Sequence, residues 1–62
     1  MPTAEYGERL KLLLVEDDEA VRSQMRWALS EDYQVLQAGD RPAAVALMRR
    51  ERPPLVCLDL GL

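Results

Sequence analysis

The sequence has few of the features that mark disulfide-bonded or membrane proteins. It contains a single cysteine, Cys57, so no disulfide framework and no paired-cysteine metal or redox motif can form within the chain. Its longest apolar runs are only a few residues, and the first ten residues carry Glu5, Glu8 and Arg9 where a signal peptide would need an apolar stretch. We therefore expect a protein of the reducing cytoplasm with no membrane contact.

Positive charge is also scarce. Eleven Asp and Glu residues outweigh eight Lys and Arg residues, which gives a net charge of −3. Binding to nucleic-acid phosphates needs concentrated positive charge, so we expect no direct contact between this segment and nucleic acid. Internal repeats, low-complexity tracts and Gly/Ser-rich linkers are absent, although residues 1–9 are polar enough to form a flexible leader.

The composition is that of a small globular domain. Hydrophobic residues make up 48% of the chain and charged residues 31%, a balance typical of packed proteins rather than of disordered tails. A chain of 62 residues forms at most one small domain. Domains of this size bury only about 60% of the surface of the unfolded chain, so the expected stability is marginal.

Three short segments have the pattern of strands. Residues 10–15 (LKLLLV) form a nearly continuous apolar run, typical of a central parallel strand that is buried on both faces. Residues 33–38 (YQVLQA) alternate apolar residues with glutamine, which predicts a half-buried or edge strand. Residues 55–58 (LVCL) follow Pro53 and Pro54 and predict a third strand that ends at Asp59.

Two helices are predicted between these strands. Val21, Met25, Ala28 and Leu29 recur at the spacing of one helical face, and Asp18 precedes them as a candidate N-cap for a helix that ends near Ser30. A second helix is expected to run to about Arg50. Its signals are an aspartate cap, a proline in the first turn, an apolar side and a basic C-terminal end, supplied by Asp40, Pro42, Ala44, Val45, Leu47, Met48, Arg49, Arg50 and Arg52.

Strands that alternate with helices of about 10 residues predict right-handed crossovers and a parallel sheet, in an α/β fold. In such sheets ligands bind outside the carboxyl ends of the strands. Glu16 and Asp17 follow the first strand and Asp59 follows the third, so three carboxylates are expected at this edge. Carboxylates brought together repel one another unless a cation or protons compensate, and Mg²⁺ is a hard cation that prefers oxygen ligands.

Two segments, LKLLLVEDDEAVR at residues 10–22 and LVCLDLGL at residues 55–62, resemble the receiver domains of bacterial two-component response regulators, and the resemblance covers most of the chain. It implies a flavodoxin-like (CheY-like) doubly wound parallel sheet, of which residues 10–62 supply the N-terminal β-α-β-α-β portion with strand order 2-1-3. It also implies transfer of a phosphoryl group from a sensor histidine kinase to Asp59. The metal ligands implied for Mg²⁺ are Glu16, Asp17, Asp59 and the backbone carbonyl of Gly61.

Two shorter segments, RWAL at residues 26–29 and LDLGL at residues 58–62, resemble a subgroup of transcriptional regulators. These are the NtrC-type, sigma-54-dependent regulators associated with PEP-CTERM exosortase systems, in which the receiver precedes an ATPase and a DNA-binding helix-turn-helix. The chain departs from the receiver pattern because the residues of the second half, including a hydroxyl residue after a fourth strand and a lysine after a fifth, are not in it. Such a module is a signalling domain, not an enzyme.

Three alternatives to a receiver domain differ from it at named residues or in activity. A phosphatase of the haloacid dehalogenase type needs a second acid two residues after the nucleophile, where this chain has Gly61, and a dinucleotide-binding half would show GxGxxG where this chain has residues 16–19 (EDDE). The third is a half-domain without phosphotransfer activity. The strand order implied by the resemblance would leave residues 55–58 as an uncharged edge, so we expect self-association, as a dimer or by edge-strand pairing.

Overall fold

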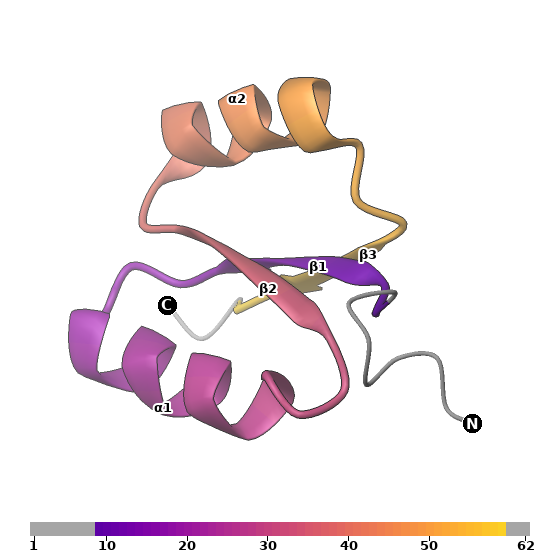
Figure 1. The fold of residues 1–62 in the computed structure, drawn as a ribbon. Helices are drawn as coiled ribbons and strands as arrows, with labels where there is room; N and C mark the ends of the chain where they lie inside the picture. Colours follow the sequence, from indigo (N-terminus) through magenta and orange to yellow (C-terminus); the bar gives the residue numbers. More distant parts are fainter. Residues whose placement is uncertain (1–8, 60–62) are drawn as a thin grey trace.

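The computed structural model describes residues 9–59, which form a three-stranded parallel sheet with one helix on each face (Figure 1). The elements are β1 (Lys11–Val15), α1 (Glu19–Leu29), β2 (Gln34–Ala38), α2 (Arg41–Glu51) and β3 (Leu55–Leu58). The strand order is β2-β1-β3, and both strand pairs are parallel. The predicted α/β class, element order and strand order are therefore confirmed.

Most of the predicted leader, residues 1–9, lies outside the described residues. Arg9, at the end of this segment, is described, and its Nη1 donates a hydrogen bond to the carbonyl of Ser30 at 2.6 Å.

The core is centred on β1, as its sequence predicts. Leu12, Leu13 and Leu14 are 7%, 1% and 0% exposed, because β1 lies between the other two strands and is covered by a helix on each face. The outer strands are less buried. Among the residues of β2 and β3 only Ala38 is fully buried. The prediction of a buried central strand and a half-buried second strand is confirmed.

The two helices begin at the predicted caps. Oδ1 of Asp18 accepts a hydrogen bond from the backbone N–H of Val21 at 3.1 Å, and Oδ1 of Asp40 accepts one from Ala43 at 2.9 Å. Each bond satisfies an N–H that has no partner within the helix. At its other end α2 closes on Arg52, whose φ of 49° lies in the left-handed region that usually favours glycine.

The apolar faces of both helices remain partly exposed. No residue of α1 or α2 is fully buried, and Val21, Val45 and Met48 are 39%, 40% and 45% exposed. The reason is geometric, since three strands of four or five residues cannot cover the whole apolar side of a helix of 11 residues. Neither helix is long and apolar enough to cross a membrane, and no other helix occurs in the described part of the chain.

Candidate functional site

The three strands end at one level, which brings the predicted acidic residues to one edge. Val15 is in register with Ala38 on one side and with Leu58 on the other. The next residue of β1, Glu16, donates its backbone N–H to the carbonyl of Ala38 at 3.0 Å, and Asp59 donates its N–H to the carbonyl of Val15 at 3.2 Å. Glu16 therefore stands between the ends of the two outer strands, beside Asp59.

The Glu16 carboxyl group is buried and only partly hydrogen-bonded. The residue is 3% exposed, and its Oε2 accepts a hydrogen bond from the backbone N–H of Asp18 at 2.9 Å. Its Oε1 is also buried and accepts no hydrogen bond from the described residues. A buried carboxylate oxygen without a donor is costly, so this atom favours a proton or a cation nearby.

The neighbouring acids raise the pKa of Glu16 above its usual value. The largest cause is the Asp59 side chain, which lies within hydrogen-bonding reach of the Glu16 carboxyl; burial and the Asp17 side chain add to the effect, while the hydrogen bond from the Asp18 N–H opposes it. Two carboxyl groups this close do not both ionise freely. The structure thus brings Glu16 and Asp59 together as the sequence predicts.

Asp17 completes the acidic edge from a more open position. Together with Glu16 and Asp59 it lines a hollow of about 370 Å³ that continues beneath α2, and both Asp17 and Asp59 are exposed. The remaining lining residues are Leu13, Val15, Gly39, Asp40, Arg41, Ala44, Val45, Met48, Val56 and Leu58. A ligand could therefore reach the carboxylates from solvent.

The acidic edge suits a hard cation in its donor atoms, although its side chains do not form a finished ligand shell. The edge offers carboxylate oxygens, which are among the ligands that Mg²⁺ prefers. Within residues 9–59, however, no three His, Cys, Asp or Glu side chains are grouped closely enough to hold a metal ion. The fourth predicted ligand, the carbonyl of Gly61, lies outside the described residues. The chemistry of the donor set and the unmatched oxygen of Glu16 fit a cation that keeps several waters.

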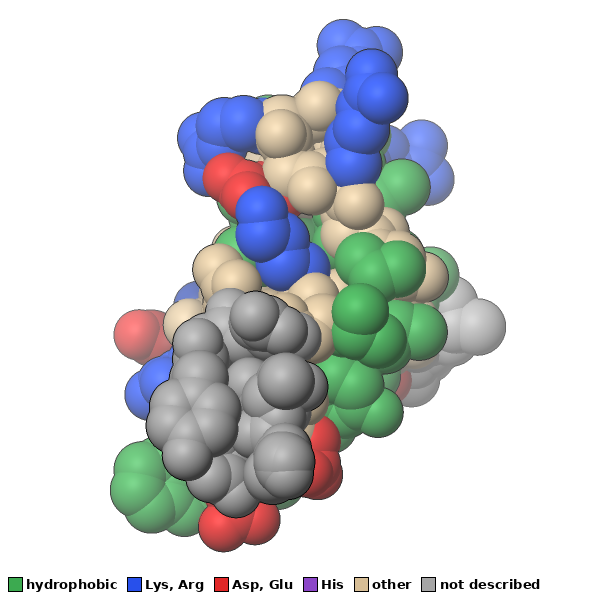
Figure 2. All heavy atoms as spheres, turned by 45° about the vertical axis from the view of Figure 1, so that its right-hand side comes forward, with side chains coloured by type: hydrophobic (Ala, Val, Ile, Leu, Met, Phe, Trp, Pro, Cys, Tyr) green, Lys and Arg blue, Asp and Glu red, His purple; other side chains and the backbone are tan. Residues whose placement is uncertain are grey.

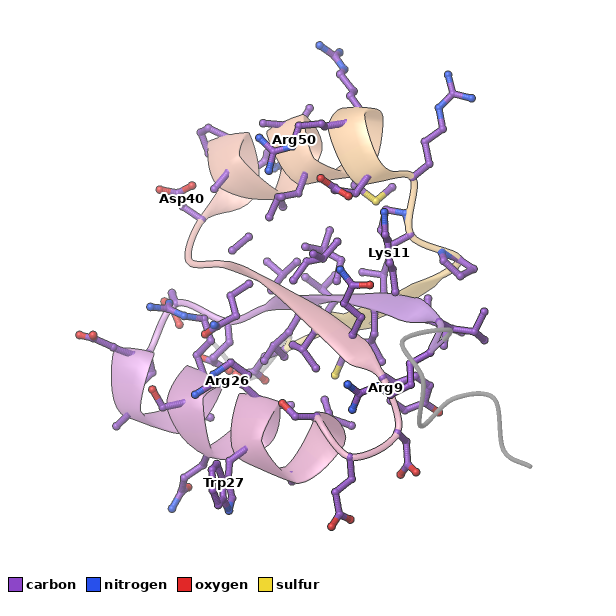
Figure 3. All side chains as sticks on the ribbon, viewed as in Figure 1. Arg9, Lys11, Arg26, Trp27, Asp40 and Arg50 are labelled. Carbon is purple, nitrogen blue, oxygen red and sulfur yellow. The ribbon has the colours of Figure 1, made fainter. Side chains whose placement is uncertain are left out.

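A larger hollow of about 500 Å³ lies elsewhere, at the C-terminal end of α1. It is lined by Arg9, Trp27, Ala28, Ser30 and Glu31. Trp27 is 78% exposed and points away from the sheet (Figure 3). This hollow brings together one cation and one acid but no cluster of carboxylates, so the smaller hollow at the strand ends is the candidate site.

The structure also places two residues at the site that the sequence patterns did not indicate. Nη1 of Arg22, in α1, donates a hydrogen bond to the backbone carbonyl of Glu16 at 2.8 Å, and Gly39 packs against the same guanidinium group. Helical spacing places Arg22 one turn after the Asp18 cap. No sequence signal indicates that its side chain turns back to the acidic loop.

Comparison with known proteins shows a similarity to a protein named as a transcriptional regulator. The chain is 35% identical over 57 residues to a protein of Mycobacterium tuberculosis (strain H37Rv) named "Probable transcriptional regulatory protein TcrX". The match covers 90% of this chain and 24% of that protein, so the chain spans about a quarter of its relative's length. No protein-family model and no solved structure matches the chain.

Proposed function

We propose that residues 10–62 are the N-terminal half of a response-regulator receiver domain, with Asp59 as the phosphoryl acceptor. The observation that carries the proposal is the buried Glu16 carboxyl beside Asp59 at adjoining strand ends. The parallel order β2-β1-β3 is compatible with part of a flavodoxin-like sheet. The similarity to a protein named as a transcriptional regulator supports a role in regulating transcription.

In the proposed mechanism each carboxylate has a distinct role. Mg²⁺ would be held by Asp17, Asp59 and the carbonyl of Gly61, with Glu16 acting through water, and would neutralise negative charge on the incoming phosphoryl group. An oxygen of Asp59 attacks the phosphorus of a phosphohistidine in the sensor kinase. The new oxygen–phosphorus bond replaces the nitrogen–phosphorus bond, and the histidine leaves as the neutral ring after taking up a proton.

Calorimetric titration with Mg²⁺ tests the metal part of the proposal. We expect weak binding by the wild-type chain and a loss of about tenfold or more in the Asp17→Asn and Asp59→Asn variants, since each removes a charged oxygen ligand. Asp32→Asn is the matched control because Asp32 lies in the turn between α1 and β2. Equal affinity in wild type and Asp17→Asn would remove the metal site.

Phosphoryl transfer is tested by intact mass after incubation with a small-molecule phosphodonor. The 62-residue chain on its own should not be labelled measurably, because the lysine and the hydroxyl residue that would compensate the phosphoryl charge are not in it. A chain that adds the fourth and fifth strands should gain one phosphoryl group, and its Asp59→Asn form none. Stoichiometric labelling of the short chain, or labelling of the extended Asp59→Asn chain, would contradict the proposal.

An alternative function is self-association of the half-domain through β3. Val56 and Leu58 are 49% and 55% exposed, and within residues 9–59 β3 pairs with β1 alone. Figure 2 shows Lys and Arg side chains gathered over α2 and hydrophobic side chains exposed below them. Antiparallel pairing of two β3 edges would place the acidic end of one copy beside the arginines at the end of α2 in the other, so opposite charges would meet.

A further inference from the structure

Glu16 has four polar groups, its N–H, its carbonyl and its two carboxyl oxygens, and three of them form hydrogen bonds with other described residues. Its N–H donates to the Ala38 carbonyl at 3.0 Å, its Oε2 accepts from the Asp18 N–H at 2.9 Å, and its carbonyl accepts from Nη1 of Arg22 at 2.8 Å. The fourth group, Oε1, is the buried oxygen at the acidic edge. The first two bonds are formed by the backbone of neighbouring segments. The bond from Arg22 is the one that depends on a single distant side chain.

Arg22 links α1 to the loop that carries the acids. Its backbone N–H donates to the carbonyl of Asp18 at 2.8 Å as the first bond of the helix, and its side chain returns to Glu16, six residues earlier. The loop between β1 and α1 is therefore held at both its start and its end by one residue. A hydrogen bond from a charged donor to a carbonyl is stronger than a neutral one.

Gly39 leaves the space that this contact needs. A methyl group at position 39 would lie 2.8 Å from Nη1 of Arg22 and 3.6 Å from Cζ, and the first distance is shorter than non-bonded carbon–nitrogen contacts allow. The guanidinium would have to move, and it can do so easily because it is the end of a flexible side chain. The movement would break its bond to Glu16 without requiring the backbone to shift.

We propose that Arg22 is a positioning residue for the acidic site, and that its hold on the Glu16 carbonyl depends on the absence of a side chain at position 39. The inference rests on the proposed cation-binding function, and it adds a residue of α1 to that site. Arg22 would bind neither the cation nor the phosphoryl group directly, because its side chain is bonded to the Glu16 carbonyl. It acts by fixing the direction in which the Glu16–Asp17 segment presents its oxygens, and preorganised ligands bind more tightly than mobile ones.

The test is a double-mutant cycle between positions 22 and 39. Arg22→Met keeps the length of the side chain without its hydrogen bond, and Gly39→Ala adds only the methyl group. We expect each single variant to weaken Mg²⁺ binding by about 3- to 10-fold, the range that the loss of one hydrogen bond predicts. When Arg22 is already Met, Gly39→Ala should not weaken Mg²⁺ binding further, because the guanidinium group that the added methyl group would displace is absent.

Amide hydrogen exchange in the presence of a chelator supplies a readout that needs no metal. Both single variants should increase exchange at the N–H groups of Glu16 and Asp18, whose hydrogen bonds order the loop, and leave the N–H groups of β2 unchanged. Arg26→Met is the matched control. It removes the same charge from α1 one turn further on, where the side chain has no hydrogen bond to the described residues, so it should change neither affinity nor exchange.

The outcomes separate this inference from the proposed function. If the wild-type chain binds no Mg²⁺, the cation site fails, while the exchange cycle still decides whether Arg22 and Gly39 order the loop. If Arg22→Met leaves both readouts at the wild-type level, the positioning role is wrong. It is equally wrong if Gly39→Ala has the same effect with and without Arg22, or if Arg26→Met matches Arg22→Met, because the effect would then come from the backbone or from charge alone.

Discussion

At the amino end of the parallel strands Nζ of Lys11 lies 2.8 Å from Oε1 of Glu51, whereas at the carboxyl end the carboxyl group of Glu16 faces that of Asp59. Hydrogen bonds from Lys11 and then from Arg50 lower the pKa of Glu51. Asp59 raises the pKa of Glu16. Two glutamates on one small sheet are thus shifted in opposite directions. Opposite charges pair where α2 meets β1, whereas carboxyl groups come together at the edge where ligands of parallel sheets bind.

Both ends of the sheet depend on the packing of β1. Removing part of that packing should therefore cause the largest loss of folding stability. Leu14 is 0% exposed, so Leu14→Ala should cost about 2–5 kcal/mol, a large part of the stability of a domain this small. Leu10→Ala is the matched control; Leu10 is 57% exposed, and the change should stay within about 0.5 kcal/mol. Urea unfolding measures both. Equal losses in the two variants would contradict a core centred on β1.

A second experiment tests whether two copies of the chain pair through β3, so that the acidic end of one sheet lies beside the basic end of the other. We expect the wild-type chain to associate through β3, and Val56→Lys to weaken this association by about tenfold or more, since charge on an edge strand opposes pairing. Trp27→Lys adds the same charge in α1, where Trp27 is 78% exposed and points away from the sheet, and should leave association unchanged. Sedimentation at several concentrations gives the masses. A wild-type monomer that does not depend on concentration would remove the self-association model.

The sequence predicted the elements and the acidic edge because both depend on local patterns. The three strands and two helices lie within one residue of their predicted bounds, and both aspartate caps are present. How far the helices are buried does not follow from their periodicity, because periodicity identifies an apolar face but not how much sheet is available to cover it. The contact between Arg22 and Glu16 could not be predicted, since it depends on a side-chain conformation and on free space beside Gly39.

Opposite pKa shifts predict opposite pH responses at the two ends. The lowered pKa of Glu51 gives stability that is present above the ordinary glutamate pKa and is lost as the pH falls through the folded-state value. The raised pKa of Glu16 makes its ionised form destabilising, so stability should rise as the pH falls from neutral through the raised value. Without metal, Glu16→Gln should therefore raise the melting temperature at pH 7, and the gain in stability on going from neutral to lower pH should disappear in this variant.

Thermal unfolding of the matched Glu51→Gln variant completes the pH comparison. It should lower the melting temperature slightly at pH 7, because the ion pair with Lys11 is partly exposed, and the difference from wild type should shrink in high salt and disappear in acid. If Glu16→Gln instead destabilises the protein at pH 7, or if both variants shift the melting temperature in the same direction, the proposed difference between the ends is wrong.

The most direct test of the acidic site is an NMR titration of the glutamate side-chain carboxyl carbons against pH, with and without Mg²⁺. Without the cation, Glu16 should titrate above the ordinary glutamate pKa and Glu51 below it. Saturating Mg²⁺ should lower the pKa of Glu16, because a cation at this edge favours the ionised form, and leave that of Glu51 unchanged. A Glu16 pKa that does not respond to Mg²⁺, or an equal response from both glutamates, would contradict a cation site at the carboxyl ends of the strands.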